Sequence, residues 1–391
     1  MHWNNSESKS IPGQREAFLL VKTCAGEDLR RVFAGLPPPR FFWIVACVLL
    51  FGSTPLRAWT VTTINDRDYV PFSEIRTFYE FNLAAVTPST IRYVKPNKVL
   101  ATQIGSRELY INNLRFYLSL PVVTRNGVTY LSRLDLAKVL DPVLRPAHIR
   151  GARIRTVILD PGHGGNDQGT WSYYGSEKAY TLDVANRLAP LLRAQGLKVA
   201  FTRTNDTYVS LEDRVQLANK NANALFVSLH FNAGAVTSGV ETYALTPRGV
   251  SSSDNKPTLH DILHAPGNDR DPENIALATA VHGALMQRVQ LPDRGIRRAR
   301  FHVLRGIEMP GVLIEGGYLA GQDAFIIAHP QFRQDMAESI ALGISRYLAA
   351  VPDMTAPPPL EKLPFATNWG LPKPPPPANL VQSSNDIPEA N

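Results

Sequence analysis

Three short apolar runs constrain the fold of this chain most, because each one ends in a side chain that can bind a metal or carry a proton. The runs and the residues that follow them are 156–159 with His163, 224–229 with His230, and 311–314 with Glu315. Such runs are typical of buried strands in an open α/β sheet, and ligands bind at the strand ends of these sheets. We therefore expect an α/β domain in which the three side chains gather at one edge.

Glu177 lies where an amphipathic helix is predicted to begin. The apolar face of that helix carries Leu182, Ala185, Leu188 and Leu192. Ser176 is a candidate N-cap, and a glutamate in a first helical turn is often no more than a favourable partner of the helix dipole. Together with the imidazoles of His163 and His230, however, the carboxylate of Glu177 completes a possible ligand set. Two imidazoles and one carboxylate are the ligands of a catalytic zinc ion with an open fourth position.

Glu315 adds a second carboxylate beside this predicted metal set. A carboxylate that directly follows apolar strand residues is costly to bury unless it is paired or used. It can take a proton from water during attack on a carbonyl and deliver that proton to the leaving nitrogen. A further α/β unit between the two histidines comprises a strand over 198–202, which leads to Arg203, and a helix over 211–221 that Ser210 can cap.

In this order the motifs resemble those of the amidase-3 family, the zinc-dependent N-acetylmuramoyl-L-alanine amidases that cleave bacterial peptidoglycan. The residues that carry the resemblance are 159–165, 177–178, 201–203, 211–214, 226–233, 239–243, 293–296 and 312–319, spread over about 195 residues. The resemblance implies one Zn²⁺ ion on His163, Glu177 and His230, with Glu315 as the catalytic carboxylate. It also implies that the bond cut joins the lactyl group of muramic acid to L-alanine.

The same resemblance implies the architecture of residues 151–350, an α/β domain with a mainly parallel or mixed sheet of about six strands and helices on both faces. Arg203, Asn232 and Arg294 are candidates for contacts with the substrate or with the metal ligands. Peptidoglycan is the expected partner, an activator protein remains unidentified, and no nucleic acid is expected.

Some positions depart from the family pattern. Ala320 and Gly321 stand where the family usually has Ser-Asn, and His302 replaces a usual tyrosine. His302 is either an extra zinc ligand or a surface histidine, and we favour the surface because three ligands are already present. Residues 246–272 form a polar insert that contains His260 and His264. We interpret it as a loop on the substrate side; a plug over the zinc is the alternative.

Residues 1–58 have the pattern of an export leader. An apolar run over 41–52 follows Arg40, and small residues lead to Ala58. This run is too short for a mature membrane span, and a buried core helix or a lipid-modified Cys47 are the alternatives. Cleavage after Ala58 would remove both cysteines of the chain, which suits an oxidising compartment. We expect an exported protein of the periplasm or the cell exterior, with no stable membrane span after cleavage.

Residues 59–150 are predicted to form a small, separate α+β module. Its features are a turn over 65–68 before a strand and a helix, a hairpin around Asn112-Asn113, and a turn over 125–127 before a strand and a helix over 134–140. It loosely resembles the stalk-like domain found at the N-terminus of copper amine oxidases, which implies a spacer or wall-binding module. No histidine lies between residues 59 and 147, which argues against a copper site. These features are equally compatible with an α+β domain that only packs against its neighbours and binds no ligand.

The composition of the chain mainly excludes certain classes of protein. Lys and Arg number 41 against 34 Asp and Glu, a net charge of +7 that is weak evidence for any polyanion partner. Two cysteines exclude a disulfide-rich scaffold and a four-cysteine zinc module. Residues 351–391 are rich in proline and predicted to be extended and largely disordered. A different zinc peptidase or carboxypeptidase, or a non-catalytic wall-binding protein, are the competing functions.

Overall fold

The computed structural model describes residues 59–253 and 259–352. The predicted export leader and nearly all of the predicted proline-rich tail lie outside the described residues. Within the described residues, no helix combines the length and apolarity that crossing a membrane requires.

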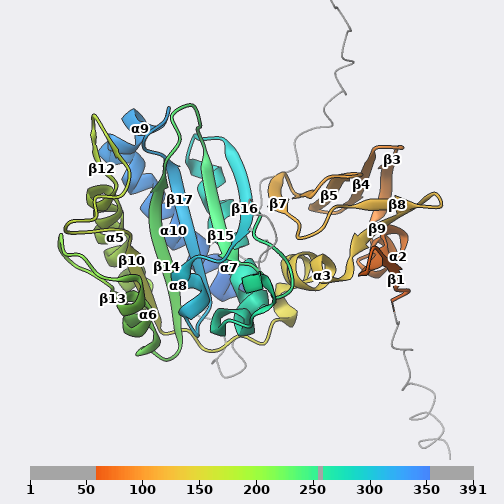
Figure 1. The fold of residues 1–391 in the computed structure, drawn as a ribbon, viewed down its shortest axis with the longest axis horizontal. Coiled ribbons are helices and arrows are strands. Elements are labelled where there is room, and N and C mark those ends of the chain that lie inside the picture. The colour runs from red at the N-terminus through yellow and green to blue at the C-terminus, as the bar shows by residue number, and fades with distance from the viewer. Residues whose placement is uncertain (1–58, 254–258, 353–391) are drawn as a thin grey trace, which may run out of the picture. The chain divides into compact units, whose positions relative to one another are not determined.

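Six neighbouring strands of an 11-stranded sheet carry the predicted site, in the order β13-β10-β14-β17-β15-β16 (Figure 1). They are β10 (Thr156–Pro161), β13 (Lys198–Phe201), β14 (Ala224–Asn232), β15 (Val240–Leu245), β16 (Asp293–Ala299) and β17 (Gly311–Tyr318). All neighbours are parallel except β15 and β17, which pair antiparallel. The expected mixed sheet of about six strands is confirmed for this part of the chain.

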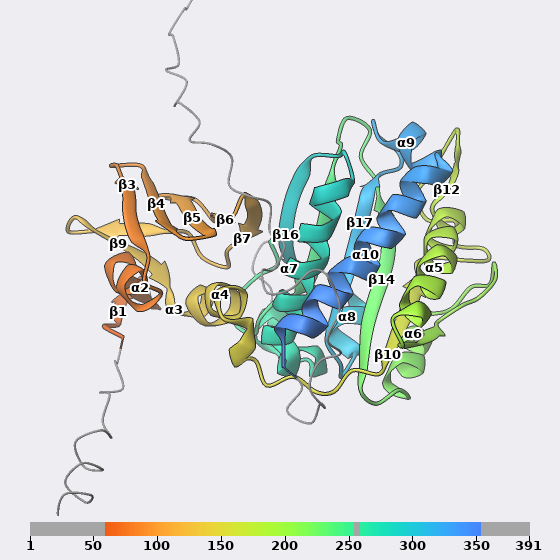
Figure 2. The same ribbon diagram turned by 180° about the vertical axis from the view of Figure 1, so that it is seen from behind.

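Helices cover both faces of this sheet. Three long helices, α5 (Glu177–Ala194), α7 (Asp271–Arg288) and α10 (Pro330–Ala350), lie on one face, with α10 packed against both of the others (Figure 2). The shorter α6 (Leu211–Asn219) and α8 (His302–Gly306) pack together on the opposite face (Figure 1). Two apolar clusters follow this division: one contains Leu188 and Ile340, the other Phe226 and Leu304.

Short elements complete this part of the chain. They are the strands β11 (Trp171–Ser172) and β12 (Gly175–Ser176), the helix α9 (Ala324–Ala328), and the 3-10 helices η3 (Leu259–Ile262) and η4 (Pro266–Arg270). β11 and β12 pair antiparallel as a hairpin that leads directly into α5. This hairpin therefore places its turn next to the helix that begins with Glu177.

Residues 59–150 form a β-rich segment with short helices. Its elements are β1 (Thr62–Ile64), β2 (Arg67–Pro71), α2 (Phe72–Phe78), β3 (Asn82–Val86), β4 (Thr90–Lys95), β5 (Lys98–Gln103), β6 (Glu108–Ile111), β7 (Leu114–Tyr117), β8 (Val123–Arg125), β9 (Val128–Ser132), α3 (Arg133–Asp135), the π-helical turn η1 (Leu136–Leu140), α4 (Asp141–Leu144) and η2 (Pro146–His148). The predicted hairpin around Asn112-Asn113 is present, and both asparagines have the positive φ that a tight hairpin turn demands. β7 also pairs with β16 through Phe116 and Ile296, so the same sheet continues into this segment.

Several local predictions need correction. Ser176 precedes α5, but its side chain makes no capping hydrogen bond, because the helix start is held by Thr170 instead. The turn predicted over 65–68 is limited to Asn65 and Asp66, since the next two residues already belong to β2. The helix predicted over 211–221 ends at Asn219. Ser210 does cap it, accepting a hydrogen bond from the backbone N–H of Asp213.

Candidate active site

The loop after β10 places His163 in an uncommon backbone conformation. Its φ is 63°, in the left-handed region, and the two glycines that follow also have positive φ. Such strain persists only where the surroundings impose it. Here Arg203 and Arg214 impose it: Arg203 donates hydrogen bonds to the carbonyls of Pro161 and Gly162, and Arg214 donates to that of His163 at 2.7 Å.

Asp160 directly follows the apolar run before this loop, and its side chain joins β10 to neighbouring residues. Its carboxylate is 1% exposed and accepts hydrogen bonds from Thr202, Arg214 and Ser228. A buried carboxylate with three donors is satisfied, and it fixes β10 to the strands on either side. The end of the strand that leads to His163 is therefore held by contacts on both sides.

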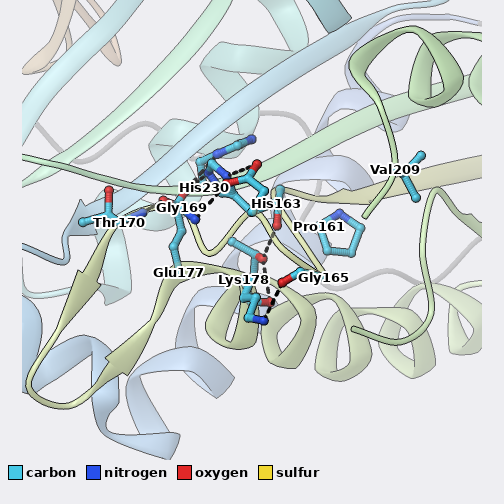
Figure 3. Close-up of polar contacts among 12 residues, drawn as sticks. Pro161, His163, Gly165, Gly169, Thr170, Glu177, Lys178, Val209 and His230 are labelled. Atoms are coloured by element: carbon cyan, nitrogen blue, oxygen red, sulfur yellow. Dashed lines mark hydrogen bonds and ion pairs between the residues drawn. The ribbon is translucent and has the colours of Figure 1, made fainter. Parts of the chain in front are cut away.

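His163, Glu177 and His230 converge on one point at the strand ends (Figure 3). The Glu177 Oε1 atom lies 3.0 Å from His163 Nε2 and 2.9 Å from His230 Nδ1. One ligand atom from each residue lies within 4.8 Å of the other two. The structure thus brings together the three residues predicted as metal ligands, and two nitrogens with one carboxylate oxygen suit zinc.

Neighbouring groups orient each member of this set. His163 Nδ1 lies 2.8 Å from the carboxylate of Asp167, which directs the other ring nitrogen toward Glu177. Glu177 accepts backbone hydrogen bonds from Thr170 at 2.7 Å and from Phe231 at 3.1 Å. Burial alone would raise the pKa of Glu177, but the hydrogen bonds and charges of the two histidines outweigh it and hold that pKa well below its usual range.

Glu315 lies beside this set, in register with His230 on the neighbouring strand. It lines, with His163 and His230, a pocket of about 190 Å³. Its Oε2 atom is inaccessible and has no hydrogen-bond partner. Burial raises the pKa of Glu315 well above its ordinary value, and the nearby charges of Glu177 and Glu241 raise it further. A buried carboxyl group with a raised pKa, beside a possible metal-ligand set, is a candidate proton carrier.

This part of the chain is similar in sequence to known proteins. The model of the N-acetylmuramoyl-L-alanine amidase family matches residues 157–346. The sporulation-specific N-acetylmuramoyl-L-alanine amidase of Bacillus subtilis (strain 168) is 32% identical over 193 residues, which cover 49% of this chain and 67% of that protein. The amidase AmiA of Salmonella typhimurium is 28% identical over 255 residues, 58% of this chain and 88% of that protein.

This chain belongs to the N-acetylmuramoyl-L-alanine amidase family. Among solved structures, an N-acetylmuramoyl-L-alanine amidase from Clostridium difficile 630 is 35% identical, with a TM-score of 0.41 and coverage of 50% of this chain and 98% of that one. The residues matched to the amidase family include His163, Glu177, His230 and Glu315. They exclude all of residues 59–150, so the likeness of that segment to a stalk domain stays a prediction.

The other predicted site residues of this amidase-family chain lie around the metal set without joining it. Arg203 is 3% exposed and holds the His163 loop, as described above. Asn232 and Arg294 both donate hydrogen bonds to Glu241, at 3.1 and 2.8 Å. Glu241 itself is buried, and it also accepts from Arg297 and from the hydroxyls of Tyr243 and Tyr318.

His302 and the polar insert lie on the pocket's outer side. His302 lines the pocket, but its Nε2 atom lies 3.2 Å from the carboxylate of Glu212, and it is not in the metal-ligand group that the described residues form. In the described part of the insert, Ile262 and Leu263 are more than half exposed, and Asp261 pairs with Arg300. No described insert residue lines the pocket that holds His163 and His230.

Sequence reasoning missed Asp167, Thr170 and Glu241 as contributors to this site. Asp167 had one available signal, since it follows His163 by four residues inside a glycine-rich loop. Thr170 acts through its backbone, which no side-chain pattern can reveal. Glu241 was noticed only as part of a family motif, because its partners come from four different strands, β14 to β17.

Proposed function

We propose that this chain hydrolyses the amide bond between N-acetylmuramic acid and the L-alanine of the stem peptide, with one zinc ion held by His163, Glu177 and His230. The single observation that carries the proposal is the convergence of these three ligand atoms within 4.8 Å, beside a carboxyl group without a partner. A zinc ion held there would polarise the amide carbonyl and make water nucleophilic at neutral pH.

The residues present fit such an ion. The donor set is two imidazoles and one carboxylate, and Asp167 gives His163 the carboxylate partner that metal-binding histidines commonly have. The pocket leaves one side of the set open toward His302 and Tyr208, so a substrate carbonyl and a water molecule can reach it. Substrate and solvent access is what distinguishes a catalytic zinc site from a structural one.

Glu315 is the residue placed to move protons in this reaction. Its raised pKa and its position in the pocket allow it to accept a proton from the attacking water and to donate that proton to the nitrogen of L-alanine as the amide bond breaks. The same carboxyl group thus acts first as base and then as acid. Its buried oxygen, free of other partners, does not have to break an existing hydrogen bond to do so.

The proposal extends to location, because peptidoglycan lies outside the cytoplasmic membrane. The leader pattern over 1–58 and the relatives named as cell-wall amidases support export to the periplasm or the cell exterior. The structure of a CwlD amidase of Clostridioides difficile is in complex with the GerS lipoprotein, and we propose that this chain is likewise open to an activating partner of unidentified nature.

Metal analysis of two variants tests the proposal. Glu177→Gln should lose stoichiometric zinc and activity together, because it removes the ligand that both imidazoles face. Glu315→Gln should keep its zinc and lose about a hundredfold or more of its rate on purified sacculi, because only the proton carrier is gone. Zinc retained by Glu177→Gln, or undiminished hydrolysis by Glu315→Gln, would refute the respective role.

A further inference from the structure

An exposed aromatic surface lies next to the metal-ligand set. We define the aromatic ledge as Trp171, Tyr173, Tyr174 and Phe325. These rings are 71%, 94%, 48% and 67% exposed, respectively. Single exposed apolar side chains are ordinary, but four neighbouring aromatic side chains of this exposure point to a binding surface.

Ring contacts and one hydrogen bond hold three of the four ledge residues together. Tyr173 and Tyr174 make an edge-to-face contact at 5.4 Å between ring centroids, and Tyr174 makes another with Phe325 at 5.7 Å. The hydroxyl of Tyr180, on α5, donates a hydrogen bond to the carbonyl of Tyr174. The hairpin is thus tied through Tyr174 both to α5 and to α9.

The base of the same hairpin is bonded to a predicted metal ligand. Thr170, the residue before Trp171, donates its N–H to Glu177 Oε2 and accepts from the N–H of Glu177 (Figure 3). Gly169 lies so close that a Cβ atom there would be 2.5 Å from Glu177 Oε2 and from His163 Cδ2. The base of the hairpin that carries the ledge is therefore in direct contact with the metal-ligand set.

The chemistry of the ledge selects among the parts of the substrate. Residues 171–176 read Trp-Ser-Tyr-Tyr-Gly-Ser and contain no charged side chain. A stem peptide or an anionic lipid surface carries negative groups that need nearby cations, which this hairpin does not provide. A sugar ring instead presents C–H bonds that pack on the negative face of an aromatic ring, and hydroxyls that match those of serine and tyrosine.

We propose that the aromatic ledge binds the glycan strand of peptidoglycan, with sugar rings stacked on Trp171 and Tyr173 so that the lactyl amide of a muramic acid residue reaches the metal-ligand set. The proposal rests on the proposed function for the identity of the substrate. It assigns the ledge a role in affinity for polymeric substrate and no role in the chemical step.

Direct binding of peptide-free glycan strands tests the ledge without requiring any catalysis. We expect the full chain to bind such strands and the double variant Trp171→Ala/Tyr173→Ala to bind them about tenfold more weakly, from the loss of two ring contacts. The variant Leu83→Ala, which removes a 57% exposed apolar side chain of β3, is the matched control and should bind as the wild type does. The double variant Trp171→Phe/Tyr173→Phe should retain most of the affinity.

Kinetics on two substrates provide the second readout. On glycan strands that carry stem peptides, the double alanine variant should raise KM about tenfold and leave kcat unchanged. On a single muramoyl peptide, both constants should stay near those of the wild type. Three results would overturn the proposed role of the ledge. They are equal glycan binding by the wild type and the alanine variant, an equal loss of activity on both substrates, and an effect of the variant on binding to anionic phospholipid vesicles alone. A chain that binds glycan through the ledge but cleaves no amide would instead refute the proposed function.

Discussion

At the scale of single residues, the site combines four predicted residues with neighbouring polar groups that orient them. The sequence alone predicted His163, Glu177, His230 and Glu315 as one set, because each follows an apolar run or begins a predicted helix, where chemistry is commonly placed in α/β proteins. It could not identify Asp167 as the partner of His163. That contact depends on the left-handed backbone at His163, which was not predictable from the residue type.

Asp167→Ala tests the orienting role. We expect zinc affinity to fall by about 10- to 100-fold, because His163 loses the carboxylate that fixes its ring and raises its basicity. Competition with a chromophoric chelator measures this affinity. Asp68→Ala is the matched control, since Asp68 is about equally exposed and pairs with Arg133 far along the chain from the ligands. An unchanged zinc affinity for Asp167→Ala would show that the contact has no orienting effect.

At the scale of elements, strands and helices with a clear period were predicted well, and elements defined by backbone contacts were not. The strand that leads to His163, the strands that contain His230 and Glu315, and the helix α5 lie where apolar periodicity placed them. β14 and β17 run further than predicted, however, to Asn232 and Tyr318. The start of α5 was assigned to the wrong partner, because the Glu177 N–H donates to the carbonyl of Thr170 while Ser176 makes no side-chain cap. Strands β3 to β5 had no prediction.

Gly169→Ala tests the close packing of the hairpin base against the site. Gly169 has a φ of +62°, and an added Cβ would meet Glu177 and His163 at 2.5 Å. We expect a loss of zinc affinity and a drop in activity of about tenfold or more, from displaced ligands. Gly196→Ala is the control: its φ is +81°, but no atom lies within 4 Å of the added Cβ.

Both glycine variants suffer the cost of a left-handed alanine, about 1–2 kcal/mol, so both should unfold at a lower temperature. Only Gly169→Ala should lose zinc binding. If the two variants bind zinc equally well, the packing of Gly169 on the ligand set is not important for the site.

At the scale of the whole described molecule, layered packing fixes where the site lies. Helices on both faces cover the sheet and leave the strand ends open, so the metal-ligand set lies where α5, β10, β14 and β17 meet. The α/β class and the mixed sheet of about six strands were predictable from the apolar runs and from the family resemblance. The continuation of the sheet through β7 was not, because strand pairing between distant segments has no local signature.

Stability should also depend on pH through Lys98, a residue of β5 far from the site in sequence. Burial, together with the nearby charge of Lys95, lowers the pKa of Lys98 to about 8, while its amine donates to the carbonyl of Leu144. The unfolded chain therefore holds this proton more tightly than the folded one. The contribution of Lys98 to the free energy of unfolding should rise as pH increases from about 8 to about 10.5.

Denaturant titrations of the wild type and Lys98→Met across this pH range measure the effect. The difference in unfolding free energy should change by on the order of 1 kcal/mol, a value reduced by the partial solvent exposure of the amine. A difference between the two proteins that is constant from pH 8 to 10.5 would contradict the assigned pKa.

The most direct test of the central claim is mass analysis of the fragments that the purified protein releases from sacculi, with and without a zinc chelator. We expect intact stem peptides that begin with a free L-alanine amine, together with glycan strands that retain an unmodified lactyl group on muramic acid. Excess chelator should abolish their release, and added zinc should restore it. Shortened peptides that remain attached to muramic acid, or full release in the presence of chelator, would contradict the account.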